Sequence, residues 1–417
     1  MRAVDLTTVP EQWGPAAQHT ARATAGAGPL TSAAELQAAD PSAIFEVVRS
    51  RAGFDALEPE WNALFDRAGR SQQLFQSFNW CWHWCNHYLD ASNRRGPRLA
   101  IVTARIDGRL VMIWPLVTQS MLATRIATFL GDPVSQYSDV IVEPGAGSQA
   151  LLRAGHGFVE AQLRVHALIV RKVRADSAIA PLLARIGARE TCREAAPFAD
   201  LRRLAGVAEY EARLPSKDYK NRRRHRRRLA EQGTISVEVL HGGEPAAALA
   251  SAAVAMKRSW LKDRGLLSRA FSDTRMDAFF ADAVGSTARP THSRVGVLRL
   301  DGRPVALEIA FRCKDRVASH IKVYDPDWEK HSPGQLLTED MIKDIFAEAP
   351  AIYDLLAPNA AYKLDWADTI EPVMDWAVPT TSLGRLQVWG YHAFARPWLK
   401  QAIDRLPVGW RKALVTL

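Results

Sequence analysis

Residues 305–324 carry side chains that could transfer protons. Their alternation of apolar and polar types predicts a β-hairpin. In the predicted register Glu308 lies opposite Lys322, with His320 one step away and Tyr324 at the strand end. A carboxylate, an imidazole and a phenol on one face can perform acid–base catalysis, whereas a solvated Glu–Lys pair would contribute under about 1 kcal/mol. The apolar face consists of four predicted pairs: Leu307 with Val323, Ile309 with Ile321, Phe311 with Ser319, and Cys313 with Val317.

The next segment, HSPGQLL at residues 331–337, predicts a junction between a strand and a helix. Ser332 can cap the helix, and Pro333 suits its first turn. Because Gly334 has no Cβ, a ligand can approach the backbone N–H groups there. Unpaired amides and the helix dipole favour an anion such as a pyrophosphate. An ordinary N-cap without a ligand is the other interpretation.

Length and composition limit the class of protein. The chain has 417 residues, 47% hydrophobic and 24% charged, which predicts a soluble globular protein of two domains. The beginning of the chain lacks the apolar core of a secretory signal, and no apolar run is long enough to cross a bilayer. The four cysteines form no disulfide framework, which favours a reducing compartment, so we expect a cytoplasmic protein.

The helical segment CWHWCNH could suggest a metal site, because Cys81 and Cys85, and likewise His83 and His87, are four residues apart. The two pairs face roughly opposite directions, and the sequence shows no second Cys/His cluster. We therefore expect aromatic helix packing and no bound metal.

Positive charge is concentrated in Lys217–Arg228. This segment holds eight Lys or Arg and one Asp, which is +7 of the formal +9 of the chain. On a helix these side chains surround most of the circumference, so one ligand cannot engage them all. Solvent, cofactor phosphates, an acidic acceptor and an anionic membrane remain open as partners. Nucleic acid is not expected, because it would require a broader positive surface and more aromatic or polar readers.

The predicted elements repeat in order. Residues 43–204 and 205–376 each begin with helices, continue through an antiparallel meander with an R-x-D-G-R turn, and end with a helix and a strand. We therefore predict an α/β (α+β) fold of two tandem units, each a mixed, largely antiparallel sheet flanked by helices. Residues 1–42 are predicted to be a disordered tail.

The last segment, 377–417, is predicted to form a tail with an amphipathic helix. Phe394, Ile403 and Leu406 recur at helical spacing, with basic residues and tryptophans among them. Such a helix can lie on an anionic bilayer. Docking on the second domain is the equally open alternative.

Four motifs together resemble one known family. They are FQSFNWCWHW, SKDYKNRRRHRRRLAEQG, YDPDWEKHSPGQLLTEDMI and YDLLAPNAAYKLDWAD. They resemble the CelD-like acetyltransferases of cellulose biosynthesis, which belong to the GNAT acyl-CoA N-acyltransferases and are related to the FemAB peptidyl transferases. The resemblance spans roughly residues 45–370. It implies two GNAT-like units, with acyl-CoA bound by the second.

The resemblance also implies site residues. The GNAT loop pattern Gln/Arg-x-x-Gly-x-Gly/Ala aligns with residues 331–336. Gly334 matches the middle glycine, whereas His331 and Leu336 differ from the first and last positions of the pattern. The cofactor-binding residues it implies are His331, Ser332, Gly334, Gln335 and Leu336. GNAT transfer is a direct attack of an amine on a thioester, which needs a base and an acid. The residues assigned to the reaction are His320 or Glu308 as base, Tyr324 as acid, and Tyr137, Asp139 and Lys363 for holding the acceptor.

The expected function is acyl transfer from acyl-CoA to an amine. The CelD-like resemblance suggests a polysaccharide precursor as acceptor, and the amphipathic tail suggests a sphingoid-type lipid amine. The protein would be cytoplasmic, with Lys217–Arg228 and residues 384–417 available for contact with the inner membrane face. A non-catalytic GNAT-like protein that binds a membrane or an assembly partner is the alternative.

Overall fold

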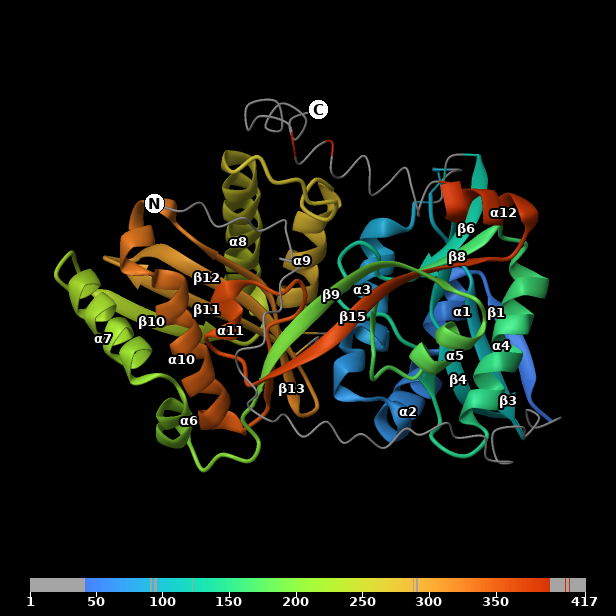
Figure 1. Cartoon of the computed structure of the whole chain (residues 1–417), viewed down its shortest axis with the longest axis horizontal. Coiled ribbons are helices and arrows are strands. Elements are labelled where there is room, and N and C mark those ends of the chain that lie inside the picture. Colours follow the sequence, from blue (N-terminus) through green and yellow to red (C-terminus); the bar gives the residue numbers. More distant parts are fainter. Residues whose placement is uncertain are drawn as a thin grey trace, which may run out of the picture.

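The computed structural model describes residues 42–390 except 91, 94–95, 122, 288 and 290–291, together with 402 and 405. Two α/β units lie side by side, and the long strands β9 (Arg189–Asp200) and β15 (Thr369–Pro379) run between them (Figure 1). The predicted α/β architecture of two units is confirmed.

The first unit contains short helices, two sheets and one long helix. Its elements are β1 (Ile44–Val48), α1 (Arg51–Ala56), α2 (Glu58–Ala68), the 3-10 helix η2 (Ser71–Gln76), α3 (Phe78–Tyr88), β2 (Arg98–Leu99), β3 (Ile101–Ile106), β4 (Arg109–Trp114), β5 (Leu116–Met121), β6 (Thr124–Phe129), β7 (Ile141–Val142), α4 (Ser148–Leu163), β8 (Ala167–Arg174), α5 (Ala180–Arg185) and β9.

The second unit repeats this order with longer helices. Its elements are α6 (Val207–Arg213), α7 (Ser216–Ala230), β10 (Ile235–Leu240), α8 (Gly243–Asp263), α9 (Arg275–Gly285), β11 (Ser293–Leu300), β12 (Arg303–Cys313), β13 (Arg316–Tyr324), the 3-10 helix η3 (Pro326–His331), α10 (Pro333–Glu348), β14 (Ile352–Asp354), α11 (Ala361–Leu364) and β15, followed by α12 (Ser382–Gln387).

The two units exchange their last strands. The larger sheet has the order β10-β11-β12-β13-β14-β9-β15-β8-β6-β5-β2, and β1, β3, β4 and β7 form a second sheet. Strand β9 of the first unit pairs with β14 of the second, whereas β15 of the second unit pairs with β8 of the first. The two exchanged strands also pair with each other. Each unit therefore completes the sheet of the other.

Asp-Gly turns close two corresponding hairpins, as the repeated turn motif predicts. Asp107 and Gly108 join β3 to β4 with φ values of 50° and 78°, and Asp301 and Gly302 join β11 to β12 with φ values of 49° and 80°. Both central residues of a type I′ turn need positive φ, which asparagine, aspartate and glycine tolerate best. The local sequence thus fixes the meander in each unit.

The basic segment forms α7, close to its predicted bounds. Its inner face packs against α10 and η3. Along this face Arg222 and Leu229 are buried, and His225 and Arg226 are partly buried. The helix forms despite its charge because its inner arginines meet carboxylates on α10, as described below.

Two predicted tails fall mostly outside the described part of the chain. Residues 1–41 of the predicted disordered tail (1–42) are outside the described part of the chain. In the predicted amphipathic tail (377–417), the structure describes residues up to 390 and then only residues 402 and 405. No helix in the described part of the chain has the length and apolar character that a bilayer crossing requires.

Candidate functional site

Strands β13 and β14 begin side by side and then separate. Their parallel pairing extends only from Arg316–Ala318 on β13 to Ile352–Asp354 on β14. Strand β13 continues to Tyr324, but β14 ends and the chain turns away through Leu356, whose φ is 60°. From Ser319 onward, one edge of β13 is therefore free of β14. We call this place the β13–β14 fork.

A β-bulge on β13 determines which side chains face each other in the hairpin. Glu308 pairs with Lys322, as predicted, and the pairs Leu307–Val323 and Ile309–Ile321 are also confirmed. The register then shifts, so that Phe311 faces Ala318 and Cys313 faces Arg316. The predicted pairs nearer the turn are wrong, because the bulge adds one residue to β13.

His320 is the extra residue, and the bulge turns it away from Glu308. Its ring lies among the rings of Phe75, Trp80, Phe280 and Phe311, with centroid distances between 4.9 and 6.2 Å. Its Nε2 is 2.7 Å from the Val134 carbonyl oxygen. Burial lowers the pKa of His320 to about 3. The structure thus places His320 in the packing between the units, where a weakly basic imidazole is poorly suited to accept a proton.

Glu308 is fully buried at the centre of a polar network. Its Oε1 accepts hydrogen bonds from Ser319 Oγ at 2.7 Å and Tyr353 Oη at 2.5 Å. Its Oε2 lies 3.1 Å from Lys322 Nζ but accepts no aligned hydrogen bond. Burial and the neighbouring Glu308 raise the pKa of Tyr353 well above its usual value. Tyr353 therefore stays protonated and donates to the carboxylate.

The network continues to the beginning of α10. Lys322 Nζ donates to Thr338 Oγ1 at 2.7 Å, and this hydroxyl donates to the Gly334 carbonyl at 2.8 Å. A continuous chain of polar contacts thus links the carboxylate on β12 to the helix terminus. Any ligand that orders this terminus is coupled to Glu308 through two side chains.

The amino terminus of α10 partly agrees with the prediction. Pro333 is the first helical residue, but Ser332 has a φ of 51° and its side chain makes no capping bond, so the predicted side-chain cap is wrong. A Cβ on Gly334 would lie 3.4 Å from Tyr324 Cδ1, an ordinary contact. The first amides of a helix commonly lack partners, but here the N–H groups of Gln335 and Leu336 donate to the Ser332 carbonyl at 2.9 and 3.2 Å. Because Pro333 has no N–H, Gly334 supplies the amide that can face an anion.

The side chains beside this terminus differ in what they offer a ligand. His331 is buried, yet neither ring nitrogen has a hydrogen-bond partner. The Gln335 side chain accepts a hydrogen bond from Trp366 Nε1, and Leu336 is fully buried in the core. The N–H groups of Gln335 and Leu336 also donate to the Ser332 carbonyl. These two residues are therefore engaged within the protein, whereas His331 retains unused polar atoms.

Tyr324 lies at the end of β13, beside Gly334. Its hydroxyl donates to Glu329 Oε1 at 2.9 Å. Burial and this carboxylate raise the pKa of Tyr324. Tyr324 therefore holds its proton at neutral pH, as a general acid must.

Lys363, on α11, contacts the segment that follows β14. Its Nζ donates to the carbonyl oxygens of Leu356 and Pro358, both at 2.8 Å. Burial and the nearby charge of Lys322 lower the pKa of Lys363 to about 7, and Lys257 on α8 adds to this effect. Burial of Lys363 near other lysine charges favours an anionic group or a developing negative charge there.

Tyr137 and Asp139 lie in the buried junction between the units instead. Tyr137 Oη donates to Asp354 Oδ1 at 2.9 Å, and Arg316 donates to the other oxygen of Asp354 at 2.6 Å. Asp139 accepts hydrogen bonds from Gln73 and from three backbone amides. Both side chains are 2% exposed. Their burial and their hydrogen bonds indicate that Tyr137 and Asp139 stabilise this junction. Neither side chain is exposed for contact with an acceptor.

The sequence patterns did not indicate several residues of the site. Ser319, Thr338, Tyr353 and Lys257 join the network or the lysine cluster only because four separate elements meet at the fork. Tyr353 carries no local signal, since the parallel pairing of β13 with β14 brings it to Glu308. Lys322 was visible in the sequence as the cross-strand partner of Glu308.

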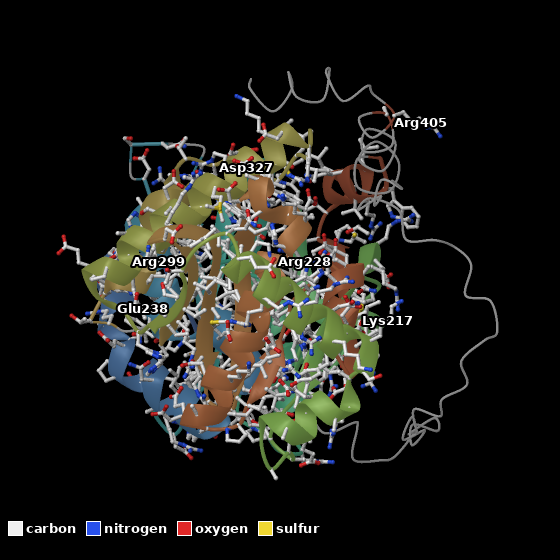
Figure 2. All side chains as sticks on the ribbon, turned by 90° about the vertical axis from the view of Figure 1, so that its left-hand side faces the viewer. Lys217, Arg228, Glu238, Arg299, Asp327 and Arg405 are labelled. Atoms are coloured by element: carbon white, nitrogen blue, oxygen red, sulfur yellow. The ribbon has the colours of Figure 1, made fainter. Side chains whose placement is uncertain are left out.

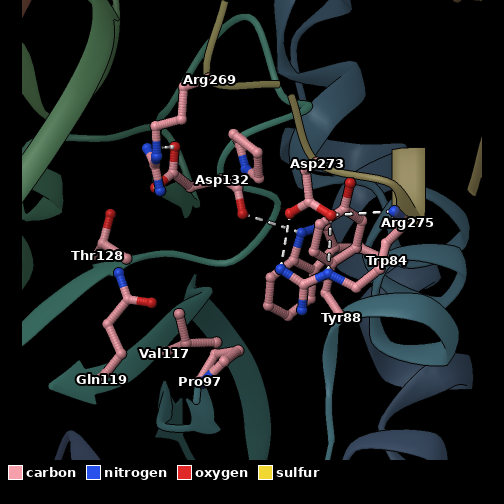
Figure 3. A pocket seen from close by; sticks show the side chains of 11 residues that line it. Trp84, Tyr88, Pro97, Val117, Gln119, Thr128, Asp132, Arg269, Asp273 and Arg275 are labelled. Carbon is pink, nitrogen blue, oxygen red and sulfur yellow. Dashed lines mark hydrogen bonds and ion pairs between the residues drawn. The ribbon is translucent and has the colours of Figure 1, made fainter. Parts of the chain in front are cut away.

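A separate cavity of about 200 Å³ lies in the region of α3, β5 and the loop between α8 and α9 (Figure 3). Its charged lining residues are paired: Arg269 binds Asp132 at 2.7 and 2.6 Å, and Arg275 binds Asp273 at 3.0 and 2.7 Å. Elsewhere on α3, His83 and His87 both contact Asp282, and the described residues contain no cluster suited to a metal ion. None of these places shares residues with the fork.

Comparisons with known proteins agree with this geometry. Residues 216–364 match the family model described as acetyltransferase (GNAT) domain. This part of the chain is similar to GNAT domains. It contains α10, the fork and most of the polar network. None of the curated proteins matches the chain in sequence.

Solved structures resemble most of the chain. FemX is 10% identical with a TM-score of 0.56, and the match covers 82% of this chain and 99% of FemX. A tandem GNAT protein from the clavulanic acid biosynthesis pathway is 13% identical with a TM-score of 0.47, covering 81% and 99%. A conserved protein of unknown function from Bacteroides thetaiotaomicron is 12% identical with a TM-score of 0.49, covering 80% and 99%. The likeness to FemX shows a shared fold over this part of the chain.

Proposed function

We propose that the protein transfers an acyl group from acyl-CoA to an amine at the β13–β14 fork. The observation that carries this proposal is the free edge of β13 beside the α10 terminus, within the GNAT domain. Unpaired strand amides can bind the amides of a pantetheine arm, as an added strand would. The helix terminus can hold the pyrophosphate, with Gly334 allowing close approach.

The chemistry follows from the groups at the fork. The acceptor nitrogen attacks the thioester carbonyl carbon, so that a C–N bond forms and the C–S bond breaks. Glu308, alone or through a water, takes the proton of the amine, and Tyr324 protonates the leaving thiolate. Lys363 and Lys322 provide positive charge for the carbonyl oxygen or for an anionic group of the acceptor. His320 is left out, because its Nε2 is engaged and its pKa is low.

Two acceptor classes fit the proposal. The CelD-like resemblance favours the amine of a polysaccharide precursor, as in exopolysaccharide production. A sphingoid-type lipid amine is the second candidate, with the protein cytoplasmic and peripheral on the inner membrane face. The alternative to catalysis is a GNAT-like protein that binds a membrane or an assembly partner without transferring an acyl group.

Thermal unfolding of the full chain with CoA, acetyl-CoA or palmitoyl-CoA tests the donor. A ligand at a hundredfold excess over its Kd stabilises the folded state by about 2.7 kcal/mol, so a clear rise in Tm is expected. A stronger response to palmitoyl-CoA would favour a lipid amine.

Two substitutions at one position provide the control. Gly334→Ala adds an uncharged methyl group at ordinary contact distance from the protein and should reduce the shift only in part, because it narrows the approach of the ligand. Gly334→Asp places a negative charge at the proposed phosphate site and should abolish it. Absence of a shift in the wild-type chain with all three ligands would overturn the donor assignment and favour the non-catalytic alternative.

A further inference from the structure

The outer side of α7 is a row of positive charge that the proposed reaction does not use. Its exposed residues along Lys217–Arg228 are Lys217, Lys220, Arg223, Arg224, Arg227 and Arg228. Figure 2 faces this part of the molecule, with Lys217 and Arg228 near the two ends of the helix. We call these six residues the α7 ridge. It extends for about 16 Å, at 1.5 Å per helical residue.

The inner side of α7 fixes the ridge beside the donor site. Arg226 donates to Asp340 at 2.8 Å, to Glu339 at 3.1 Å and to the Leu336 carbonyl at 3.3 Å. Arg222 stacks on Trp366 at 4.6 Å. These contacts hold α7 against the first two turns of α10, so the ridge cannot move independently of the helix whose terminus is proposed to bind phosphate.

One end of the ridge adjoins that terminus. Helix α7 contacts η3 as well as α10, and Arg226 donates to the Leu336 carbonyl in the first turn of α10. Arg227 and Arg228 follow Arg226 directly in the chain and therefore lie toward this terminus. Lys217 lies nine residues, about 14 Å, farther along α7. This part of the ridge suits a partner larger than a nucleotide.

The charge pattern of the ridge favours a protein as its binding partner. Acidic residues lie on the same face: Glu231 is 3.8 Å from Arg227, and exposed Asp327, on η3, and Glu238, on β10, lie farther from the ridge (Figure 2). A narrow positive row with negative flanks matches an acidic helix better than a uniformly anionic surface. The ridge has no large apolar side chain to enter a bilayer. Its one aromatic neighbour, Tyr219, stacks with Arg223 at 5.7 Å.

We propose that the α7 ridge docks an acidic carrier protein that delivers the acyl group on a 4′-phosphopantetheine thioester. The inference rests on the proposed function, because it concerns the donor of the same fork. Coenzyme A and such a carrier present the same pantetheine arm. They differ beyond the phosphate, where CoA continues into a nucleotide and the carrier into an acidic protein. That protein would lie outside the fork and over the ridge.

The test compares affinities for a fluorescently labelled, palmitoylated acyl carrier protein. The full chain is titrated beside the variant Lys217→Glu/Lys220→Glu/Arg223→Glu/Arg227→Glu. The matched control is Arg49→Glu/Arg109→Glu/Arg164→Glu/Arg185→Glu, which makes the same charge change at exposed positions of the first unit. The ridge variant should bind about tenfold more weakly or worse, and the control should bind as the wild type does. Palmitoyl-CoA should stabilise all three chains equally.

Parallel titrations distinguish the other occupants. They use vesicles containing phosphatidylglycerol and unfractionated tRNA. If carrier affinity is unchanged by reversal of the ridge, the inference is overturned. It is equally overturned if only vesicles or tRNA bind in a ridge-dependent way. Should the fourfold reversal unfold the chain, the same four positions are changed to Gln and the comparison is repeated.

The result also separates the two proposals. Stabilisation by palmitoyl-CoA without binding of the carrier would refute the ridge inference and leave the proposed function intact. If neither palmitoyl-CoA nor the carrier binds the wild-type chain, both fail.

Discussion

Tyr353 donates its hydroxyl to Glu308 Oε1 across 2.5 Å, from strands that flank β13 on opposite sides. Ser319 on β13 donates to the same oxygen. Three adjacent strands thus meet at one carboxylate, immediately where β13 and β14 begin to separate. The separation of the two strands and the position of the proposed base are therefore linked.

Tyr353→Phe should separate catalysis from stability. Loss of this hydrogen bond should lower the free energy of unfolding by about 1 kcal/mol and slow acyl transfer at least tenfold, because Glu308 is no longer held in place. The rate is measured as thiol release from acyl-CoA with glucosamine or sphinganine. Tyr210→Phe is the matched control: its buried hydroxyl donates to the Trp366 carbonyl at 2.8 Å, outside the network. Equal rates in both variants would contradict the role of Tyr353.

Glu308→Gln should have the larger effect. The amide cannot take a proton from an amine, and it leaves the Lys322 ammonium without its charge partner in a buried site. Breaking a buried ion pair in this way costs about 3–5 kcal/mol. We expect a loss of turnover of at least a hundredfold and a lower Tm, measured by thiol release and thermal unfolding. A variant with undiminished turnover would exclude Glu308 as the base.

Lys363→Met should impair transfer more than donor binding. The substitution keeps most of the length of the side chain but removes the amino group, its charge and its two hydrogen bonds to carbonyl oxygens. Turnover should fall at least tenfold, whereas the Tm shift with acyl-CoA should persist. If the Tm shift disappears and the residual rate at saturating donor is normal, Lys363 serves binding instead.

Asp354→Asn should destabilise the junction between the units. Asp354 is fully buried and contacts Arg316 at 2.6 Å and Arg174 at 3.6 Å. Loss of its charge leaves two guanidinium groups short of a partner, and we expect a loss of about 3–5 kcal/mol in urea unfolding. Tyr137→Phe, which removes one neutral donor to the same carboxylate, should cost about 1 kcal/mol. A reversed ranking would refute this account of the junction.

His320 should contribute to acid sensitivity. Its pKa is about 3 in the folded chain and near 6.5 when unfolded, so the unfolded state binds more protons between these values. Stability from this group is therefore complete above pH 6.5 and declines as the pH falls toward 3, by up to about 1.4 kcal/mol per pH unit. His320→Leu should flatten this decline, measured by urea unfolding between pH 7 and 5. An unchanged slope would show that His320 does not remain neutral in the folded state.

Local sequence patterns predicted the fold well. Asp-Gly pairs located the hairpins, and the alternation in β12 and β13 placed Glu308 opposite Lys322. The same alternation could not reveal the bulge at His320, because one inserted residue leaves the pattern on each side intact. The alternation therefore placed His320 on the same face of the hairpin as Glu308, which is wrong.

Long-range packing explains the other differences. Tyr137 and Asp139 carry polar groups typical of a binding site, but they satisfy partners more than 30 residues away in sequence, which no local pattern encodes. Ser332 has the residue type of an N-cap, yet its positive φ directs the side chain elsewhere. Residue type thus predicted the role of a site residue more reliably where the partners of that residue were close in sequence.

The exchange of β9 and β15 has a consequence for how the protein can be divided. A fragment cut in the linker after β9 would keep a strand that belongs beside β14 and would lack the strand that belongs beside β8. Each half alone would expose open sheet edges and be prone to aggregation. Co-expressed halves, in contrast, should reassemble by fragment complementation. Evolution of this chain from a single ancestral unit would then be easiest through a dimer that already exchanged its terminal strands.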